Sequence, residues 1–123
     1  MDEAWVVIDH DGRDDRIIQD VVDGLNKLGK AFHLALSNPN FELWLLLHFE
    51  DASGVQTKTE CDVRLSKYIK HYDKTIPDTI LRSVRDAIAR AERKDCLSNE
   101  AWPHRCGTTV YKLVKLLIPD APK

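Results

Sequence analysis

The chain has 123 residues, a length typical of one domain, and 43% of its residues are apolar while 31% are charged. A formal net charge of −2 gives no overall attraction to nucleic acid, so such contacts need a local basic patch. No apolar run approaches the roughly 18 residues of a membrane span, and no signal peptide is evident. Three widely spaced cysteines without a Cys-x-x-Cys motif favour reduced thiols, and therefore a cytoplasmic location, over a disulfide scaffold or a zinc site.

The first 36 residues predict a βαβ unit. Residues 4–9 are a short apolar run closed by a turn signal, which is typical of a buried strand. Residues 14–28 carry apolar side chains at helical spacing, with Asp14 and Asp15 in the first turn, where the helix dipole favours acidic groups. Residues 31–36 have the pattern of a second strand. This order of elements predicts two parallel strands joined by a right-handed crossover.

A second helix is expected to follow. Ser37 and Asn38 stand ahead of Pro39, a pattern that favours a helix start, and the helix should run to about Glu50. Its surface is almost entirely apolar, which requires burial on all sides.

The rest of the chain predicts further helices. They follow a polar loop at 51–59 and are expected near 60–72, 77–93 and 108–118. A loop is expected around Asn99 to Gly107, with Thr108 capping the last helix and Pro119 ending it. We therefore expect a single α/β domain over 1–123, with a βαβα core over 1–50 and a helical part over 60–118.

The predicted sheet is too small to stand alone. Parallel sheets usually have several strands and both faces covered. The run Val6 to Ile8 implies neighbours on both sides, and no segment after residue 36 resembles a further strand. We therefore expect additional strands from another chain, from a second copy or from an upstream segment.

Two carboxylates stand at the end of the first strand. Asp9 and Asp11 are followed at once by Gly12, and ligands of open α/β sheets bind at the carboxyl ends of strands. Neighbouring carboxylates repel each other unless a cation lies between them, and their oxygens suit Mg²⁺ or Mn²⁺. If the strand continues to Asp11, both side chains point the same way. The alternative is that Asp9 caps the following turn and Asp11 is solvated.

Glu42 is a further candidate, because it lies in the first turn of the expected second helix and so at the same sheet edge as Asp9. A buried carboxylate there needs a metal or a basic side chain as partner, or it interacts only with the helix N-terminus. Ser37 and Asn38 are expected to cap that helix, whose N-terminus can contact a phosphate. His48 is expected to be a hydrogen-bonded core residue.

A basic stripe is expected on the helix near 77–93. The stripe is formed by Arg82, Arg85, Arg90 and Arg93. Such a stripe can follow a phosphate backbone. Asp86 lies in the same sector, so the alternative is an ordinary solvated face.

Three segments resemble the RloB-like family. They are Val-Val-Ile-Asp-His-Asp at 6–11, Ser-Asn-Pro-Asn-Phe-Glu-Leu-Trp-Leu-Leu-Leu-His-Phe at 37–49, and Thr-Thr-Val-Tyr-Lys-Leu-Val at 108–114. The resemblance implies a core similar to Toprim domains, a Mg²⁺-dependent fold, and an association with restriction and phage-defence loci, often beside an ATPase. It implies a nuclease subunit acting on DNA or tRNA, with Asp9 and Asp11 on the metal and Glu42 as a catalytic group.

The sequence departs from the family in one respect. Toprim-like proteins carry a glutamate after an earlier strand, whereas only Met1-Asp2-Glu3 precedes the first strand here. We therefore expect the missing carboxylate to come from another chain or from a longer protein. The alternative function is a non-catalytic subunit that docks on an ATPase or assembles with itself.

Overall fold

The computed structural model describes residues 2–96 and 102–118, and it contains one sheet with strand order β1-β2-β3. The strands are β1 (Ala4–Asp9), β2 (Phe32–Asn38) and β3 (Gly107–Thr108). β1 and β2 are parallel, with Asp9 opposite Ser37, while β3 pairs antiparallel with the end of β2. The predicted fold class, α/β with a parallel strand pair, is confirmed.

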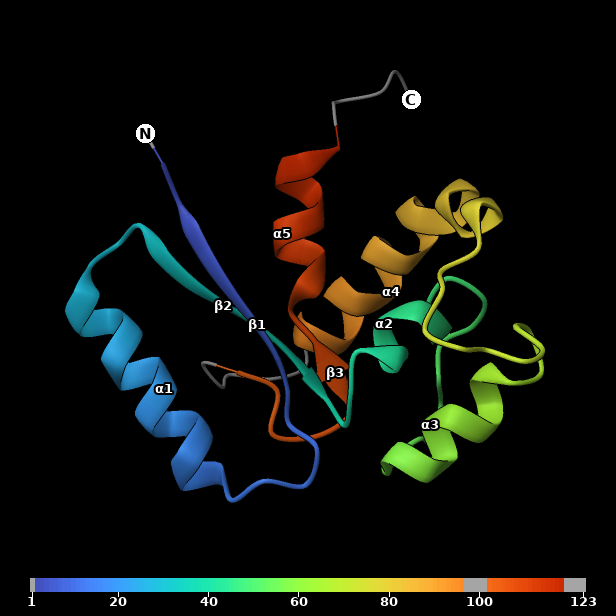
Figure 1. Cartoon of the computed structure of the whole chain (residues 1–123), viewed down its shortest axis with the longest axis horizontal. Coiled ribbons are helices and arrows are strands. Elements are labelled where there is room, and N and C mark those ends of the chain that lie inside the picture. The colour runs from blue at the N-terminus through green and yellow to red at the C-terminus, as the bar shows by residue number, and fades with distance from the viewer. Residues whose placement is uncertain (1, 97–101, 119–123) are drawn as a thin grey trace.

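Helices lie on both faces of the sheet (Figure 1). The helix α1 (Asp15–Leu28) connects β1 to β2 and covers one face, where Ile18 and Leu36 are fully buried together with Trp102. The other face is covered by α2 (Glu42–Leu46), α4 (Val84–Cys96) and α5 (Val110–Leu117). The helix α3 (Lys58–Leu65) packs on α2, and the 3₁₀ helix η1 (Asp78–Ser83) leads into α4.

The helix α1 matches its prediction because its signals are local. The Asp14 side chain caps it by accepting a hydrogen bond from the Arg16 backbone N–H at 2.9 Å. The chain turns at Gly29, whose φ of 121° lies in a region that L side chains rarely adopt. The crossover therefore brings β2 back parallel to β1, so that both strands end at the same edge.

The second helix is much shorter than predicted. Residues 43–47 are buried, as the apolar pattern requires, but α2 ends at Leu46 and tight turns follow it. The predicted capping by Ser37 and Asn38 is wrong, since both residues belong to β2. Their backbone pairs with Thr108 and Gly107, and this pairing keeps the strand extended past residue 36.

The third strand corrects the prediction that no strand follows residue 36. Thr108 is a strand residue, and α5 begins at Val110. The Thr108 hydroxyl nevertheless accepts a hydrogen bond from the Val110 backbone N–H at 3.2 Å, so Thr108 also caps the start of α5, as predicted. The Thr109 hydroxyl accepts a hydrogen bond from the Leu36 N–H at 2.9 Å, which anchors the start of α5 to the middle of the sheet. Part of the loop expected at 99–107, and the stop expected at Pro119, lie outside the described residues.

The other two helices also differ from expectation. The helix expected at 60–72 spans only Lys58–Leu65, with the Thr57 side chain as its cap, and irregular backbone follows it. The helix expected at 77–93 begins as η1 and becomes regular only at Val84. None of the helices in the described parts of the chain is long and apolar enough to cross a membrane.

The first strand is less buried than its apolar run predicts. Val6 is 36% exposed and Val7 is 49% exposed, because β1 is an edge strand. Within residues 2–96 and 102–118, only β2 pairs with it. The expected burial of Val6 to Ile8 is therefore wrong for this chain by itself, and the expected additional strands stay a prediction.

Candidate functional site

Asp9 is the last residue of β1, and its carboxylate faces the start of α2. Its Oδ1 atom accepts a hydrogen bond from the Phe41 backbone N–H at 2.9 Å. Burial raises the pKa of Asp9 above its usual value, and the negative charges of Glu42 and Asp11 raise it further. The hydrogen bond from Phe41 has the opposite effect on this pKa but does not cancel the rise. A carboxylate with a raised pKa beside two others is a common feature of a functional site.

Asp11 lies in a turn and not in the strand. β1 ends at Asp9, and Asp11 has a φ of 52°, so the alternation that would align the two side chains does not apply. The Asp11 backbone N–H nevertheless donates to the Pro39 carbonyl at 2.8 Å, which holds the turn against the end of β2. The Asp11 side chain is about half exposed, and the Lys58 ammonium lies 3.9 Å from its Oδ1 atom.

Glu42 opens α2 and is only 5% exposed. The Tyr72 hydroxyl donates to its Oε2 atom at 3.0 Å, and the Lys74 Nζ atom lies 3.2 Å from its Oε1 atom. The buried Glu42 carboxylate thus has a basic partner, Lys74, which is one of the alternatives predicted from the sequence. Burial and the hydrogen bond to Glu42 both raise the pKa of Tyr72, so Tyr72 stays a hydrogen-bond donor.

The three acidic side chains supply the oxygen ligands that Mg²⁺ prefers. In the described parts of the chain, however, no group of three or more His, Cys, Asp or Glu side chains is arranged to hold a metal ion. Mg²⁺ usually keeps several waters and takes only one or two carboxylates from the protein. A site of that kind would need Asp9 and one neighbouring carboxylate, and Glu42 and Asp11 both lie near enough to Asp9 to raise its pKa.

A cleft of about 530 Å³ gives access to this edge of the sheet. It runs between the free side of β1 and α1, with acidic groups at one end and apolar side chains along its length. Its lining consists of Val7, Ile8, Asp9, Asp11, Arg13, Ile17, Ile18 and Val21. Asp9 and Asp11 can therefore be reached from outside, whereas Glu42 does not line the cleft.

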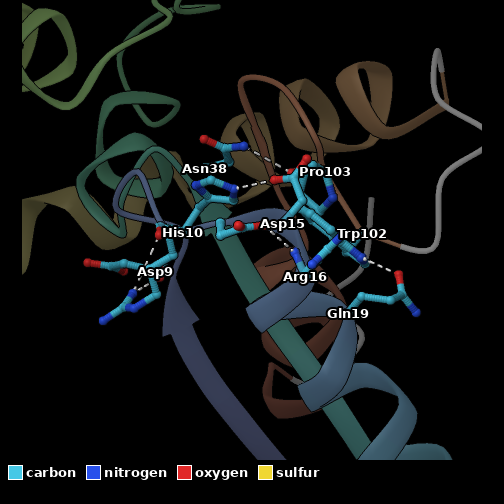
Figure 2. A network of polar contacts seen from close by, with 10 residues as sticks. Asp9, His10, Asp15, Arg16, Gln19, Asn38, Trp102 and Pro103 are labelled. Carbon is cyan, nitrogen blue, oxygen red and sulfur yellow. Dashed lines mark hydrogen bonds and ion pairs between the residues drawn. The ribbon is translucent and has the colours of Figure 1, made fainter.

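His10 points away from Asp9 and joins a separate network (Figure 2). Its Nε2 atom donates to the Asp15 carboxylate at 2.9 Å, and its ring lies tilted against the Trp102 ring at 5.9 Å. Trp102 is 2% exposed and donates from its indole to Gln19 at 3.1 Å. The sequence offers little signal for Trp102, since it stands in an irregular segment, and His10 and Gln19 are more than 80 residues away from it in the chain.

Ser37 and Asn38 are held by the segment that leads into β3. The Ser37 hydroxyl lies 2.7 Å from the Thr108 hydroxyl, and the Asn38 amide donates to the Pro103 carbonyl at 3.1 Å. Both residues are buried. Their expected contact with a phosphate stays a prediction, but the helix N-terminus that motivated it begins four residues later, at Glu42.

The four arginines of the predicted stripe fall into two pairs with different contacts. Arg90 donates to the Leu47 carbonyl at 2.7 Å and, with Arg93, pairs with Asp51. Arg90 therefore satisfies a backbone carbonyl just beyond α2. Arg82 and Arg85 are exposed, the first on η1 and the second in the first turn of α4.

His48 is a core residue, as expected. It is 5% exposed, its Nδ1 atom donates to the Trp44 carbonyl at 2.9 Å, and its ring meets the Trp44 ring edge-on. Burial lowers the pKa of His48, which favours the neutral ring. Cys61 and Cys106 are free thiols, and burial raises the pKa of both, so neither is activated as a nucleophile.

Together, the fold and this site define an α/β protein with an acidic cluster at the carboxyl edge of a parallel strand pair. The model of the RloB-like protein family matches residues 1–117, and the chain belongs to this family. No curated protein and no solved structure matches the chain significantly.

Proposed function

We propose that this chain is a Toprim-like, Mg²⁺-dependent nuclease subunit of an anti-phage defence system. The observation that carries the proposal is the state of Asp9, a partly buried carboxylate with a raised pKa at a strand end, flanked by Asp11 and Glu42. Burial and the two neighbouring negative charges both disfavour the ionised form of Asp9. A bound divalent cation would offset both unfavourable effects. Membership of the RloB-like family supports this reading, since the resemblance implies a Toprim-related core.

In this proposal Asp9 and Asp11 would hold Mg²⁺ or Mn²⁺ from the open cleft. A bound ion would polarise the scissile phosphate and stabilise the leaving oxygen. Glu42 would act as the general base, once released from Tyr72 and Lys74, by accepting a proton from the attacking water. The Phe41 N–H keeps the Asp9 carboxylate oriented toward the start of α2.

A buried amide oxygen next to this site is consistent with a polar ligand or water. Asn40 is fully buried, and its Nδ2 atom donates to the Asp62 carboxylate at 3.1 Å. The side-chain amide nitrogen must face that carboxylate, so the Oδ1 atom is the one that receives no hydrogen bond from any described residue. Asn40 lies two residues before Glu42 on the same connection.

The proposed substrate is nucleic acid, either DNA or tRNA. Of the four residues predicted to contact it, Arg82 and Arg85 are exposed, whereas Ser37 and Asn38 are buried and hydrogen-bonded. Exposed guanidinium groups can contact phosphates without rearrangement of the core. We therefore expect Arg82→Ala and Arg85→Ala to weaken nucleic-acid binding at low salt.

The test is cleavage of DNA and of tRNA in Mg²⁺ or Mn²⁺. Asp9→Ala and Asp11→Ala should abolish cleavage, and Glu42→Gln should slow it by about 10²–10⁴-fold, the usual contribution of a general base. Asp20→Ala, which alters an exposed aspartate of α1, serves as the matched control. Cleavage that persists unchanged in the Asp9 and Asp11 variants would remove the mechanism.

The second candidate function is a non-catalytic subunit that docks on an ATPase partner or on a second copy. The observation that favours it is the edge of β1, which pairs only with β2 among the described residues and exposes Val7 to 49%. Natural proteins normally protect such edges, because an unpaired valine-rich strand recruits another strand.

Size-exclusion chromatography with light scattering separates the two candidates. An oligomer or hetero-complex that Val7→Lys disrupts would support docking at β1, since a lysine on an edge strand opposes pairing. Val63→Lys is the matched control, because Val63 is 57% exposed on α3. A stable, well-folded monomer would count against an assembly that completes the sheet.

A further inference from the structure

Two cationic side chains lie at the acidic end of the cleft, next to the turn that follows β1. Arg13 precedes α1 and lines the cleft together with Asp9 and Asp11. Lys58 is the first residue of α3, and its ammonium lies 3.9 Å from the Asp11 Oδ1 atom. In Figure 1, α1 lies to the left of this turn and α3 to its right. The acidic edge is therefore bordered by positive charge from two separate segments of the chain.

The Arg13 guanidinium is bonded to backbone carbonyls and not to a carboxylate. Its Nη1 atom donates to the Asp9 carbonyl, and the His10 carbonyl lies 3.5 Å from the same atom. Among residues 2–96 and 102–118, no carboxylate forms an ion pair with Arg13. A guanidinium has five N–H donors, and Arg13 is exposed, so donors and a positive charge remain for an anion in the cleft.

Lys58 is only loosely held by Asp11. The Lys58 side chain is 55% exposed and that of Asp11 is 46% exposed. At 3.9 Å the two charges attract each other without a hydrogen bond, and exposed ion pairs of this kind are weak. The three N–H donors of the ammonium can therefore turn to an anion that enters beside Asp11.

These two cations change the charge that an approaching phosphate would meet. Asp9 and Asp11 by themselves would repel a phosphodiester, which carries one negative charge. Arg13 and Lys58 set two positive charges against the two negative ones, so this end of the cleft is electrically balanced. Arginine binds two phosphate oxygens with paired donors, and lysine binds phosphate as a point charge. The arrangement therefore suits a phosphodiester backbone that crosses the acidic end of the cleft.

We propose that Arg13 and Lys58 bind the phosphate backbone of the nucleic-acid substrate next to the acidic site. This inference deepens the proposed function and rests on it, since it takes nucleic acid as the substrate. It adds two contacts to the exposed pair Arg82 and Arg85, and both new contacts adjoin the carboxylates. Backbone contacts position a nucleic acid without reading its sequence, so DNA and tRNA should depend on them in the same direction.

The experiment measures binding of the full chain to a fluorescein-labelled DNA duplex and to labelled tRNA. Fluorescence anisotropy in EDTA, over a range of NaCl concentrations, separates phosphate binding from metal binding and from cleavage. Arg13→Met and Lys58→Met should each make the plot of log K against log [NaCl] less steep by about 0.9 for the duplex, the change expected for one lost phosphate contact. At about 0.1 M NaCl, binding should be about five- to ten-fold weaker.

Two further variants serve as controls. Lys27→Met removes the same charge at an exposed position in the last turn of α1 and should leave the salt dependence unchanged. Lys58→Arg retains the charge and should bind as the wild type does. A circular-dichroism melt shows that each variant is folded before its binding is compared.

Each outcome decides the role of the two cations separately from the cleavage reaction. If Arg13→Met and Lys58→Met show the salt dependence of Lys27→Met, or if the wild type binds no nucleic acid in EDTA, the phosphate-binding role is overturned, and cleavage in Mg²⁺ alone decides the proposed function. A change in only one variant removes the other residue from the inference. If both variants lose a phosphate contact but the wild type does not cleave in Mg²⁺, the binding role stands and the nuclease falls.

Discussion

Asp9→Asn should stabilise the metal-free protein at neutral pH. Burial raises the pKa of Asp9, which means that the folded chain disfavours its charged form. Asparagine removes the charge but retains an oxygen that can accept the hydrogen bond from the Phe41 N–H. Asp9→Asn should therefore raise the free energy of unfolding although it abolishes the proposed activity. Such a trade-off is common where a functional site retains groups that destabilise the fold.

The sign and size of the effect follow from linkage. In the unfolded chain Asp9 titrates near its ordinary pKa of 3.8, and in the folded chain it titrates higher. Above the raised pKa, Asp9 is ionised in both the folded and the unfolded chain, and its charge lowers the free energy of unfolding by the full penalty. As the pH falls through the raised pKa toward 3.8, Asp9 is protonated first in the folded chain, and the penalty disappears. Because this carboxylate is partly exposed, solvent screening limits the penalty to about 0.5–1 kcal/mol, the usual range for such groups.

The assay is thermal unfolding in EDTA at pH 7 and at pH 4. We expect Asp9→Asn to raise Tm by about 2–4 °C at pH 7 and by much less at pH 4. Asp20→Asn, at an exposed position of α1, should change Tm equally at both pH values. A lower Tm for Asp9→Asn at pH 7, or a gain that is the same at both pH values, would refute the reasoning.

Three further predictions test the fold around the site. Trp102→Ala should lower the free energy of unfolding by about 3–5 kcal/mol in urea titrations, because a nearly fully buried ring is lost; a loss under 1 kcal/mol would contradict its core position. Thr109→Val should cost about 1–3 kcal/mol in the same titrations, since the buried Leu36 N–H loses its acceptor, while Thr109→Ser should be much milder. Hydrogen bonding from Arg64 lowers the pKa of Glu50, so its stabilising effect is present above the ordinary value of 4.5 and lost as the pH falls through the lowered pKa. Glu50→Gln should therefore lower Tm more at pH 7 than at pH 3, and an equal loss at both pH values in scanning calorimetry would be inconsistent with this ion pair.

Local periodicity predicts the βαβ unit well because each signal is complete within one segment. The apolar run of β1, the spacing and cap of α1 and the apolar run of β2 need no knowledge of the rest of the chain. The parallel pairing then follows from the order of the elements and from the handedness of the crossover. Asp9 and Glu42 could be placed at one sheet edge for the same reason.

Elements that depend on distant partners could not be predicted. β3 has two residues, Gly107 and Thr108, and forms only because the Ser37 hydroxyl and the end of β2 lie opposite them. The apolar run after Phe41 correctly indicates burial, but burial does not fix helix length, and α2 stops after five residues. Apolar composition distinguishes inside from outside more reliably than it distinguishes a helix from successive turns.

The partners of the acidic cluster could not be predicted for a related reason. Lys58, Tyr72 and Lys74 reach the site from α3 and from the irregular backbone after it. Nothing in their sequence spacing connects them with Asp9 or Glu42. A carboxylate pattern in the sequence therefore indicates where negative charge gathers, but the tertiary fold decides which positive charge meets it.

The open edge and the acidic cluster belong to the same strand, and this links the two candidate functions. A strand docked in parallel beside β1 would bury Val7 and end next to Asp9, because the carboxyl ends of parallel strands share one edge of a sheet. It would also exclude water from the cleft, and charges interact more strongly in a drier site. Completing the sheet would then complete the site. Cleavage activity confined to an assembled form would show that docking at β1 serves the nuclease, whereas full activity in the monomer would show that cleavage needs no docked strand.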